Sequence, residues 1–567
     1  RDIDFVIDKK YHWANEEVNN LVVHYNGHRA SVMAIAKMLD TSYLPDLSSL
    51  GSKLADLPGH FAACFVGAKW SLIVADKISS YPIFYILRDK SLIVSNSART
   101  LANKYELHKV DKESLTEFRM TGYVTGKDTL FKDLSKLRAG EAMLFGQNTL
   151  EFKRYYQFHS ALTDTKKEID LINELEDLTN TVFDRLIESM HGRRIVIPLS
   201  GGLDSRLVLC KLLERGAKNI FTFSYGSPGN RDALAAKDIA SKLGLSWEFI
   251  PTGRKQAKDI FSSSLRKEYW NYSDHLHIAP SMHTFCALSS LHHQKRLFKD
   301  MVIVNGQSGD FISGNHIPKM PTDKIISSAL VGAIAKKHYS HNILLSNQPV
   351  FLGFVENRVA RVLEGMPSVM NMQGFAKQIE CWGWQARQSI RVVHGQRNYD
   401  FFGLGWELPL WEVEYLNFFQ KLSLEHKFER RLFRHWLEHR NPFGLFRGYM
   451  PYASRWPRGR DGIHLIGRAI SGSLGRKVSV KWYRALDCFS QYEYQYAPFG
   501  YFGYWKGLQE FSSIIGYLTK AWEVENKDIL EKLNEFKKKV KSKYEIISVF
   551  SNKDLLKVKK LLIKNVN

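Results

Sequence analysis

The sequence predicts a multidomain chain in which an α+β unit with mostly antiparallel strands precedes an α/β unit with a doubly wound parallel sheet and a helical C-terminal part. Three observations predict this class. Short alternating apolar segments separated by turn residues run from Val22 to about Tyr156. Buried-type strands and helices then alternate between residues 193 and 251, as parallel βαβ units require. The length of 567 residues is long for one hydrophobic core.

The elements can be assigned in order along the chain. Strands of the first unit are expected in LVVHYNG, GHFAACFVGAKWSLIVADK, YPIFYILRDKSLIVSNS and GEAMLFGQNTLEFKRYY. Residues 165–190 have apolar residues three and four positions apart, which predicts a helix that joins two domains. The second unit follows with strands RRIVIPLS, NIFTFSYG and SWEFIP around helices SRLVLCKLLERG and DALAAKDIASKLG. From about Phe354 the pattern is helical, and the basic segment 527–567 is interpreted as a solvated helix face.

Composition limits the class of protein. Hydrophobic residues make up 44% and aromatic residues 13% of the chain, as in globular proteins. The net charge of +22 favours anionic partners, and nucleotides, acidic sugars, nucleic acid and membrane surfaces all qualify. The five cysteines are scattered without a CxxC pair, which argues against a disulfide framework and a cysteine-rich zinc site. With charges near the N-terminus and no apolar run of about 18 residues, we expect a cytoplasmic protein without a transmembrane segment.

The turn PLSGGLDSR is the first candidate site. It follows an apolar strand and precedes a helix that we expect to begin near Arg206. Glycine lets backbone amides approach an anion closely, and a helix N-terminus adds free N–H groups and a favourable dipole. The spacing fits neither GxxxxGK[ST] nor GxGxxG, so the turn is either a phosphate-binding turn of another kind or an ordinary turn between strand and helix with an aspartate cap.

A second small-residue loop follows the apolar strand MVIV. It contains Gly306, Gln307 and Asp310. Because Mg²⁺ bridging phosphates takes hard oxygen ligands, Asp204 and Asp310 are expected to bind it. Ser224, Tyr225 and Gly226 end a neighbouring strand, where adenine and ribose would lie if the first loop holds the phosphates.

These segments resemble a known family. SGGLDS, FSYGSPGNRDALAAKDIA and NGQSGDFISG are similar, in this order, to the PP-loop ATP pyrophosphatase domain of asparagine synthetases. The segments between Gly59 and Phe145 resemble the class II glutamine amidotransferase domain that precedes it. The resemblance implies an Ntn-hydrolase-like αββα sandwich and an adenine nucleotide alpha hydrolase-like domain. The domains are expected at 1–165 and 166–480, with a basic helical extension at 481–567.

The resemblance implies an ATP-dependent, Mg²⁺-dependent carbon–nitrogen ligase. It would adenylate an acceptor carboxylate, release pyrophosphate and transfer ammonia or another amine; an acidic sugar or surface polysaccharide precursor is one candidate acceptor. Nucleic acid is not expected as a partner, and a homodimer is left open. The expected catalytic residues are Asp204, Gln307 and Asp310. The expected ATP-binding residues are Leu199, Ser200, Gly201, Gly202, Asp204, Ser205, Ser224, Tyr225, Gly226 and Gly306.

The sequence departs from the family at several positions. The family's glutaminase uses an N-terminal cysteine, whereas this sequence begins with Arg1 and first has a cysteine at Cys64, so the first domain is expected to lack the nucleophile unless preceding residues supply it. Gln307 stands where asparagine-forming members have glutamate, and Phe311 replaces the second acidic residue. Alignment on Pro409 puts Glu407 at a family arginine and Glu412 at an aspartate, and the late catalytic lysine is not placed.

Other functions are compatible with the same residues. Lasso-peptide cyclases and β-lactam synthetases form amides within one molecule on a related domain. A tRNA-modifying PP-loop enzyme would suit the basic charge, and a non-catalytic nucleotide-binding protein would suit the loss of the nucleophile. His275, His277 and His283 are expected to line the acceptor cleft rather than bind zinc.

Overall fold

The structure is a computed structural model that describes residues 3–88, 91–107, 109–146, 149–161, 163–319, 327–369, 371–448, 503 and 506–531. The late arginine-rich segment 453–462 and most of the predicted C-terminal extension lie outside the described residues. None of the helices that are described has the length and apolarity needed to span a membrane.

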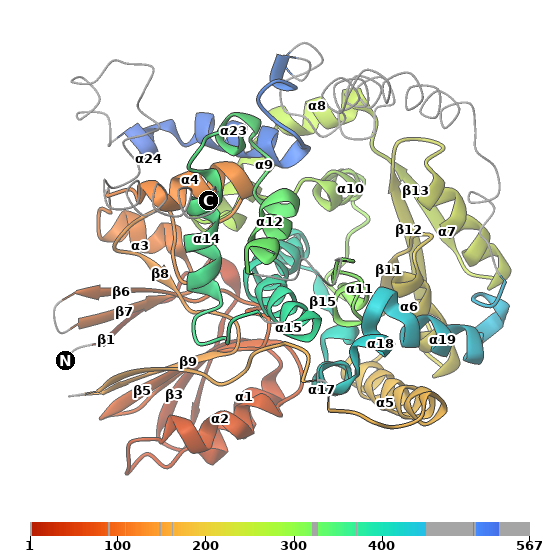
Figure 1. The fold of residues 1–567 in the computed structure, drawn as a ribbon, viewed down its shortest axis with the longest axis horizontal. Helices are drawn as coiled ribbons and strands as arrows, with labels where there is room; N and C mark the ends of the chain where they lie inside the picture. Colours follow the sequence, from red (N-terminus) through yellow and green to blue (C-terminus); the bar gives the residue numbers. More distant parts are fainter. Residues whose placement is uncertain are drawn as a thin grey trace, which may run out of the picture.

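The first unit is an αββα sandwich (Figure 1). Its six-stranded antiparallel sheet is ordered β10 (Leu150–Arg154), β9 (Glu141–Gly146), β5 (Trp70–Ala75), β4 (Phe61–Val66), β3 (Leu21–Gly27) and β2 (Ala14–Val18). Its four-stranded sheet is ordered β1 (Ile3–Val6), β7 (Ser91–Ser95), β6 (Phe84–Arg88) and β8 (Ser135–Lys136), with β1 parallel to β7. The helices are α1 (Arg29–Met38) and α2 (Leu47–Ala55) on the larger sheet, and α3 (Ala98–Lys104) and α4 (Lys112–Thr121) beside the smaller one.

The alternation of apolar residues explains the two layers. Every residue of β5 is buried, because this strand lies between the helical layer and the second sheet. One face contributes Leu72 and Val74 to the core under α1 and α2, and the other contributes Ile73 to the core between the sheets. The mostly antiparallel unit that the sequence predicts is therefore present, with strands that begin earlier than the predicted Val22.

The second unit contains a five-stranded, all-parallel sheet. Its order is β13 (Trp247–Pro251), β12 (Ile220–Gly226), β11 (Arg194–Pro198), β14 (Met301–Val304) and β15 (Gly405–Glu407). The chain moves from β11 outward through β12 to β13 and returns on the other side of β11 as β14. The strand order thus reverses between β11 and β14, which is where ligands bind in doubly wound sheets.

Helices cover this sheet and extend toward the first unit. They are α5 (Glu168–Ser189), α6 (Leu203–Glu214), α7 (Arg231–Lys242), α8 (Arg254–Ser262), α9 (Ser264–Ser273), α10 (His283–His293), α11 (Gly309–Ile312), α12 (Ser327–His338), α13 (Ile343–Ser346), α14 (Phe351–Val362), α15 (Met372–Trp382), α16 (Arg397–Phe401), α17 (Val413–Lys421), α18 (Leu424–Lys427), α19 (Arg431–Arg440), α23 (Ile514–Glu525) and α24 (Lys527–Glu531). A π-helix, Gly383–Val392, continues α15 directly. The predicted helix at 165–190 corresponds to α5.

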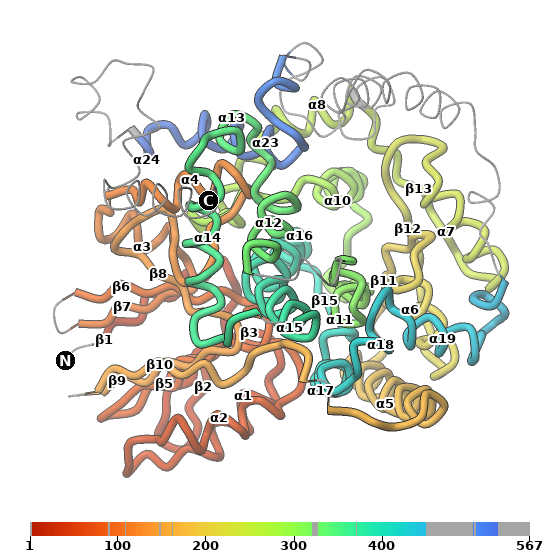
Figure 2. Tube along the Cα trace, in the orientation of Figure 1, coloured from red at the N-terminus to blue at the C-terminus, as the bar shows by residue number. Residues whose placement is uncertain are grey.

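The two units share buried contacts. Ile78 and Phe158 of the first unit belong to the same hydrophobic core as the parallel sheet. The chain also returns from the C-terminal side: α23 packs on α4, with Trp522 against Phe118 (Figure 2). Contacts between segments far apart in sequence therefore fix the first unit against the second.

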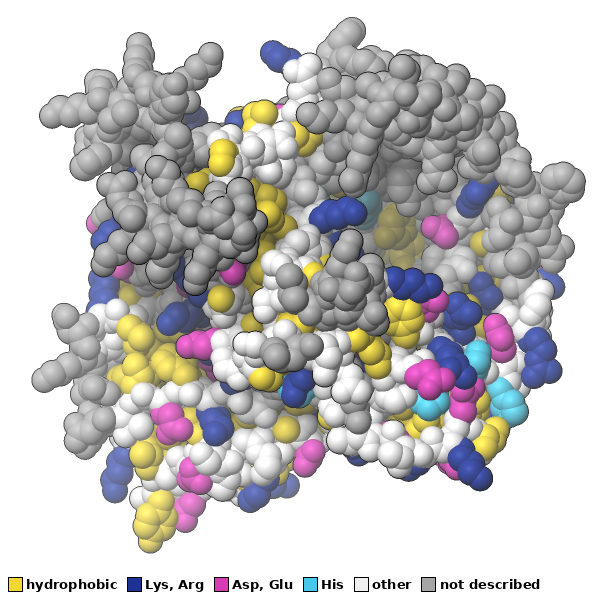
Figure 3. Space-filling view, viewed as in Figure 1, with side chains coloured by type: hydrophobic (Ala, Val, Ile, Leu, Met, Phe, Trp, Pro, Cys, Tyr) yellow, Lys and Arg dark blue, Asp and Glu magenta, His cyan; other side chains and the backbone are white. Residues whose placement is uncertain are grey.

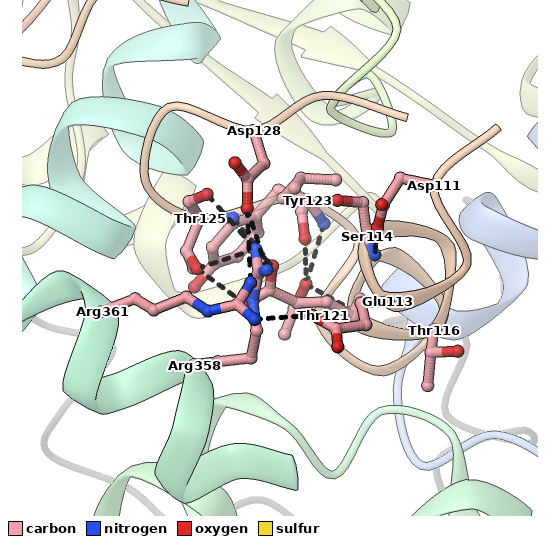
Figure 4. Close-up of polar contacts among 12 residues, drawn as sticks. Asp111, Glu113, Ser114, Thr116, Thr121, Tyr123, Thr125, Asp128, Arg358 and Arg361 are labelled. Carbon is pink, nitrogen blue, oxygen red and sulfur yellow. Dashed lines mark hydrogen bonds and ion pairs between the residues drawn. The ribbon is translucent and has the colours of Figure 1, made fainter. Parts of the chain in front are cut away.

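A buried ion pair adds to this interface (Figure 4). Arg358 of α14 pairs with Glu117 of α4, and their side chains are 2% and 0% exposed. The other terminal nitrogen of Arg358, Nη1, lies 2.9 Å from Oδ2 of Asp128. Tyr339 donates a hydrogen bond of 2.6 Å to Glu117, and Thr125 donates two more from its backbone and hydroxyl groups. The Arg358 charge holds the pKa of Glu117 below its ordinary value against the effect of burial.

Candidate active site

The two glycine-containing loops meet at the carboxyl ends of β11 and β14. A cavity of about 380 Å³ lies between them. Of the residues expected from the sequence, it is lined by Ser200, Asp204, Ser205, Tyr225, Gly306, Gln307 and Asp310. Leu199, Gly201, Gly202, Ser224 and Gly226 are close in the chain but do not line it. The strand-order reversal explains why loops about a hundred residues apart share one cavity.

The first loop is held by its own side chains. The Ser200 backbone N–H donates to the Ser205 hydroxyl at 3.2 Å, and the Gly202 N–H donates to the Ser200 hydroxyl at 3.2 Å. The Arg206 side chain donates a hydrogen bond of 2.7 Å to the Gly201 carbonyl, which ties the loop to helix α6. Helix α6 begins at Leu203, earlier than the predicted start near Arg206, so Asp204 and Ser205 lie in its first turn. The loop thus presents hydroxyls and a helix N-terminus to the cavity.

Asp204 is the electrostatic centre of the site. Its Oδ2 atom accepts a hydrogen bond of 3.0 Å from the backbone N–H of Asp310, which ties the two loops together. Its Oδ1 atom pairs with the Arg430 guanidinium, which also donates to Ser313 at 2.9 Å. Burial raises the pKa of Asp204, and the nearby Asp310 charge adds to this effect, while Arg430 opposes it.

The pKa of Asp310 is shifted in the opposite direction, below its ordinary value. Burial acts to raise the pKa of this carboxyl, but His316, whose Nε2 lies 3.2 Å from Oδ2, and the charge of Arg430 hold it below its ordinary value. Two carboxylates in one cavity are the donor set that Mg²⁺ uses when substrate phosphates supply further oxygens. The residues present therefore fit a magnesium ion, although no cluster of three or more His, Cys, Asp or Glu side chains forms among the described residues.

Two glycines permit the close contact between the loops. A Cβ atom on Gly306 would lie 2.6 Å from the carbonyl carbon of Asp204, and one on Gly309 would lie 2.9 Å from its Oδ1. Side chains at these positions would push the second loop away from Asp204. The small-residue loop is thus needed for packing as well as for ligand access.

We expect Gly306→Ala to lower both stability and activity, because backbone atoms of Asp204 cannot move aside at small cost. A loss of about 1–3 kcal/mol in unfolding free energy is typical of overpacking. Urea unfolding and ATP-dependent turnover measure the two effects. Gly332→Ala is the matched control, since nothing lies within 4 Å of that Cβ position in α12. Wild-type stability in Gly306→Ala would contradict the packing argument.

Neutral amides line the other part of the cavity. The Gln396 amide donates to Gln307 Oε1 at 2.7 Å and accepts from Asn305 at 3.3 Å. Ser308 donates to Gln388 Oε1 at 2.8 Å, which connects the second loop to the π-helix. Gln307 therefore lies in the cavity as a hydrogen-bonded neutral group.

The residues expected near adenine have separate roles. The Tyr225 side chain lines the cavity, with its hydroxyl 3.1 Å from Thr284. The Ser224 hydroxyl donates to the Leu199 carbonyl at 2.7 Å and accepts from Trp247 at 2.9 Å, so it supports the first loop. Gly226 has φ of +126° at the end of β12, a backbone conformation that favours glycine.

Several site residues were missed by sequence reasoning. They are Arg430, His316, Arg387, Gln388 and Gln396. Arg430 reaches Asp204 because both it and Glu429 adopt left-handed backbone conformations, with φ of 62° and 52°, before α19. No local motif marks these positions; only the fold brings them to the cavity.

Three groups of residues discussed from the sequence, two histidines, two glutamates and the cysteines, lie outside the Asp204 cavity. His275 and His277 are buried between the two units in a separate small cavity, not in the one that contains Asp204. Glu412 accepts from the Gly59 N–H at 3.1 Å and pairs with Arg185 at 2.9 Å, and neither it nor Glu407 lines the Asp204 cavity. All four described cysteines are buried, and burial raises the pKa of each thiol.

Comparisons with known proteins agree with this arrangement. A glutamine amidotransferase domain model matches residues 46–156, and an asparagine synthase model matches residues 176–392. A protein named as a glutamine-hydrolysing asparagine synthetase from Methanocaldococcus jannaschii is 26% identical over 184 residues, 31% of this chain and 35% of that protein. A second, from Acanthamoeba polyphaga mimivirus, is 29% identical over 202 residues, 34% of each chain. The chain thus spans about a third of the length of the curated relatives it matches.

A solved glutamine phosphoribosylpyrophosphate amidotransferase from B. subtilis overlaps 53% of this chain and 59% of its own at 12% identity and a TM-score of 0.16, a likeness too slight to carry an argument. The two matches stand in a defined order, with an amidotransferase-like domain followed by an asparagine synthase-like domain. In its two matched domains the chain is thus similar to the asparagine synthetases, at low identity and over about a third of its length for each relative.

Proposed function

We propose that this chain is an ATP-dependent amide ligase that adenylates an acceptor carboxylate, releases pyrophosphate and transfers the acyl group to ammonia or another amine. The observation that carries the proposal is the shared cavity in which the Ser200–Ser205 loop, Asp204, Asp310 and Arg430 meet. Phosphate-binding hydroxyls, two metal-type carboxylates and a cation are the groups that such a reaction needs.

The residues have distinct tasks in this mechanism. The Ser200 and Ser205 hydroxyls and the first-turn amides of α6 bind the phosphates of ATP. Asp204 and Asp310 would hold Mg²⁺, which would neutralise charge on the phosphate oxygens. Arg430, displaced from Asp204 or shared with it, offsets the negative charge that develops on the leaving pyrophosphate. The acceptor carboxylate then lies toward Gln307, so that its oxygen can attack the α-phosphate.

The second half of the reaction needs an amine in its neutral form. Gln307 can orient the amine by hydrogen bonding, but an amide does not take up a proton at neutral pH. We therefore propose that the amine arrives unprotonated. Asparagine synthetase relatives that are named as glutamine-hydrolysing point to glutamine as one donor, and free ammonia is the other.

We expect radiolabelled ATP to yield AMP and pyrophosphate only when Mg²⁺, a suitable carboxylate and an amine source are present together. The measurement separates nucleotides after incubation with ammonium or glutamine and a panel of carboxylates that includes aspartate and uronic acids. Turnover with ammonium alone would assign free ammonia as the donor. ADP as the product, or no cleavage with any acceptor, would contradict the proposal.

A further inference from the structure

Arg387 is a cavity-lining cation that has no hydrogen-bond or ion-pair partner among the residues that the structure describes. It projects from the π-helix into the same cavity as Asp204 and Asp310 and is half-buried. Across the described ranges, its guanidinium takes part in none of the hydrogen bonds or ion pairs that the structure contains. By contrast, Arg206 and Arg430 at the same site are both engaged by protein oxygens.

The surroundings of Arg387 are positive rather than neutral. Lys337, at the end of α12, is close enough that burial and then the Arg387 charge lower its pKa, while Asp310 acts in the opposite sense. Burial, with Arg387 and Lys337 next in effect, lowers the pKa of His338 to about 2. Burial lowers the pKa of His341, and the charges of Arg391 and Arg387 lower it further. The lowered pKa values leave both histidines uncharged at neutral pH, so Lys337 is the cation beside Arg387, and Asp310 opposes the effect of Arg387 on it.

The surface agrees with this concentration of charge. On the face shown in Figure 3, Lys and Arg side chains, with hydrophobic and acidic ones among them, lie at the edge of a hollow between the α12 region and the carboxyl ends of the parallel strands. Neighbouring like charges that lack an anion repel one another and cost stability. Such an arrangement is typical of a site whose anion comes from the ligand.

The position of Arg387 is fixed by its neighbours. Gln388, the next residue, accepts a hydrogen bond from Ser308 in the second glycine loop. Trp384, one turn earlier, is fully buried and donates to the Lys77 carbonyl at 2.7 Å. The π-helix is therefore held at both the cavity and the domain interface, and π-helical turns occur frequently at functional sites.

The charged groups of the cavity differ in their partners. Arg430 pairs with Asp204 and His316 lies 3.2 Å from Asp310, whereas Arg387 lines the same cavity without such a partner among the described residues. Gln307 and Gln388 also line the cavity; both are hydrogen bonded and neither carries a charge.

We propose that the acceptor carries a second anionic group, a carboxylate or a phosphate, besides the carboxylate that reacts, and that Arg387 binds this group. The inference rests on the proposed function and names the class of its acceptor. A guanidinium can bind either anion through two parallel hydrogen bonds, which also orients the rest of the acceptor. Arg387 is thus a specificity-determining residue.

The test compares acceptors that differ only in the second anion. Glucuronic acid 1-phosphate is paired with glucuronic acid, and L-aspartate with L-isoasparagine, in which the α-carboxylate is an amide. For wild type, we expect the dianionic member of one pair to have a KM for AMP formation at least tenfold lower. Whether the phosphate or the carboxylate pair responds identifies the source of the anion. Equal KM values within both pairs would overturn the inference.

Variants assign the effect to Arg387. Arg387→Gln should raise the KM of the preferred dianion at least tenfold, leave that of its monoanionic partner unchanged and leave the KM of ATP in pyrophosphate exchange unchanged. Arg387→Lys should recover part of the preference. Arg361→Gln, which removes an exposed arginine of α14, should behave as wild type. A raised KM for ATP with unchanged acceptor preference would overturn the inference and assign Arg387 to the nucleotide.

If the proposed function itself is wrong, no acceptor will support AMP formation. This result differs from equal KM values within both pairs, which would contradict the inference alone. Calorimetric titration with the same four compounds, without ATP, still decides the inference in that case. Tighter binding of a dianion that disappears in Arg387→Gln would support it, and absence of binding to wild type would overturn it. Thermal unfolding confirms that each variant is folded.

Discussion

Asp204→Asn is expected to abolish pyrophosphate release while the protein remains folded. The substitution keeps an oxygen that accepts the Asp310 N–H but removes the charge that holds Mg²⁺ and pairs with Arg430. Loss of one preorganised charged or hydrogen-bonding group at a reacting centre typically costs about 10² to 10³ in turnover, and loss of a metal ligand acts at the upper end of that range. The assay is ATP–pyrophosphate exchange at saturating Mg²⁺.

Asp184→Asn provides the control for Asp204→Asn. Asp184 is an exposed carboxylate on α5 that pairs with Arg215 on the surface, so its loss changes the net charge equally without touching the cavity. Its exchange rate should equal that of wild type. Full exchange activity in Asp204→Asn, with an unchanged requirement for Mg²⁺, would remove Asp204 from the phosphate and metal site.

Arg358→Met is expected to cause the largest loss of stability. The substitution leaves Glu117 buried at the interface between the two units without its cation, although the bonds from Tyr339 and Thr125 remain. Removing one partner of a buried ion pair costs about 3–5 kcal/mol, because an uncompensated charge stays out of water. Urea unfolding, followed by both fluorescence and circular dichroism, measures the change.

Two further variants isolate the ion pair from other effects. Arg361→Gln, one turn along α14, removes an exposed arginine and should change the unfolding free energy by about 0.5 kcal/mol or less. Adding Glu117→Gln to Arg358→Met removes the stranded charge and should recover part of the loss. If Arg358→Met were as stable as Arg361→Gln, the Arg358–Glu117 ion pair would not stabilise the contact between the two units.

The sequence predicts the order of elements and the two loops because these depend on local patterns. SGGLDS lies between a strand and a helix, and the small residues around Gly306 follow the next strand in the sheet, so their meeting at one edge follows from parallel topology. The helix start was placed three residues late, because Asp204 and Ser205 were assigned to the loop although they also fit a first helical turn.

Arg430 and Arg387 could not be predicted in the same way. Each is one of many arginines in a basic sequence, and neither belongs to a recognisable pattern. Arg430 reaches Asp204 through two left-handed residues, and Arg387 reaches the cavity through a π-helix; both depend on tertiary packing rather than on local preference. Ser224 shows the converse, since a residue expected to touch ligand instead supports Leu199.

The packing of α23 against α4 has a consequence for synthesis on the ribosome. Phe118 is covered by Trp522, and Asp274 accepts hydrogen bonds from Trp522 and from Arg99, so the first unit is completed by residues that are made long after it. At elongation rates of about 5–20 residues per second, roughly 20–80 s pass between the synthesis of Phe118 in α4 and that of Trp522, which covers it. During this interval the apolar face of α4 is exposed to water, a condition that favours aggregation of nascent chains.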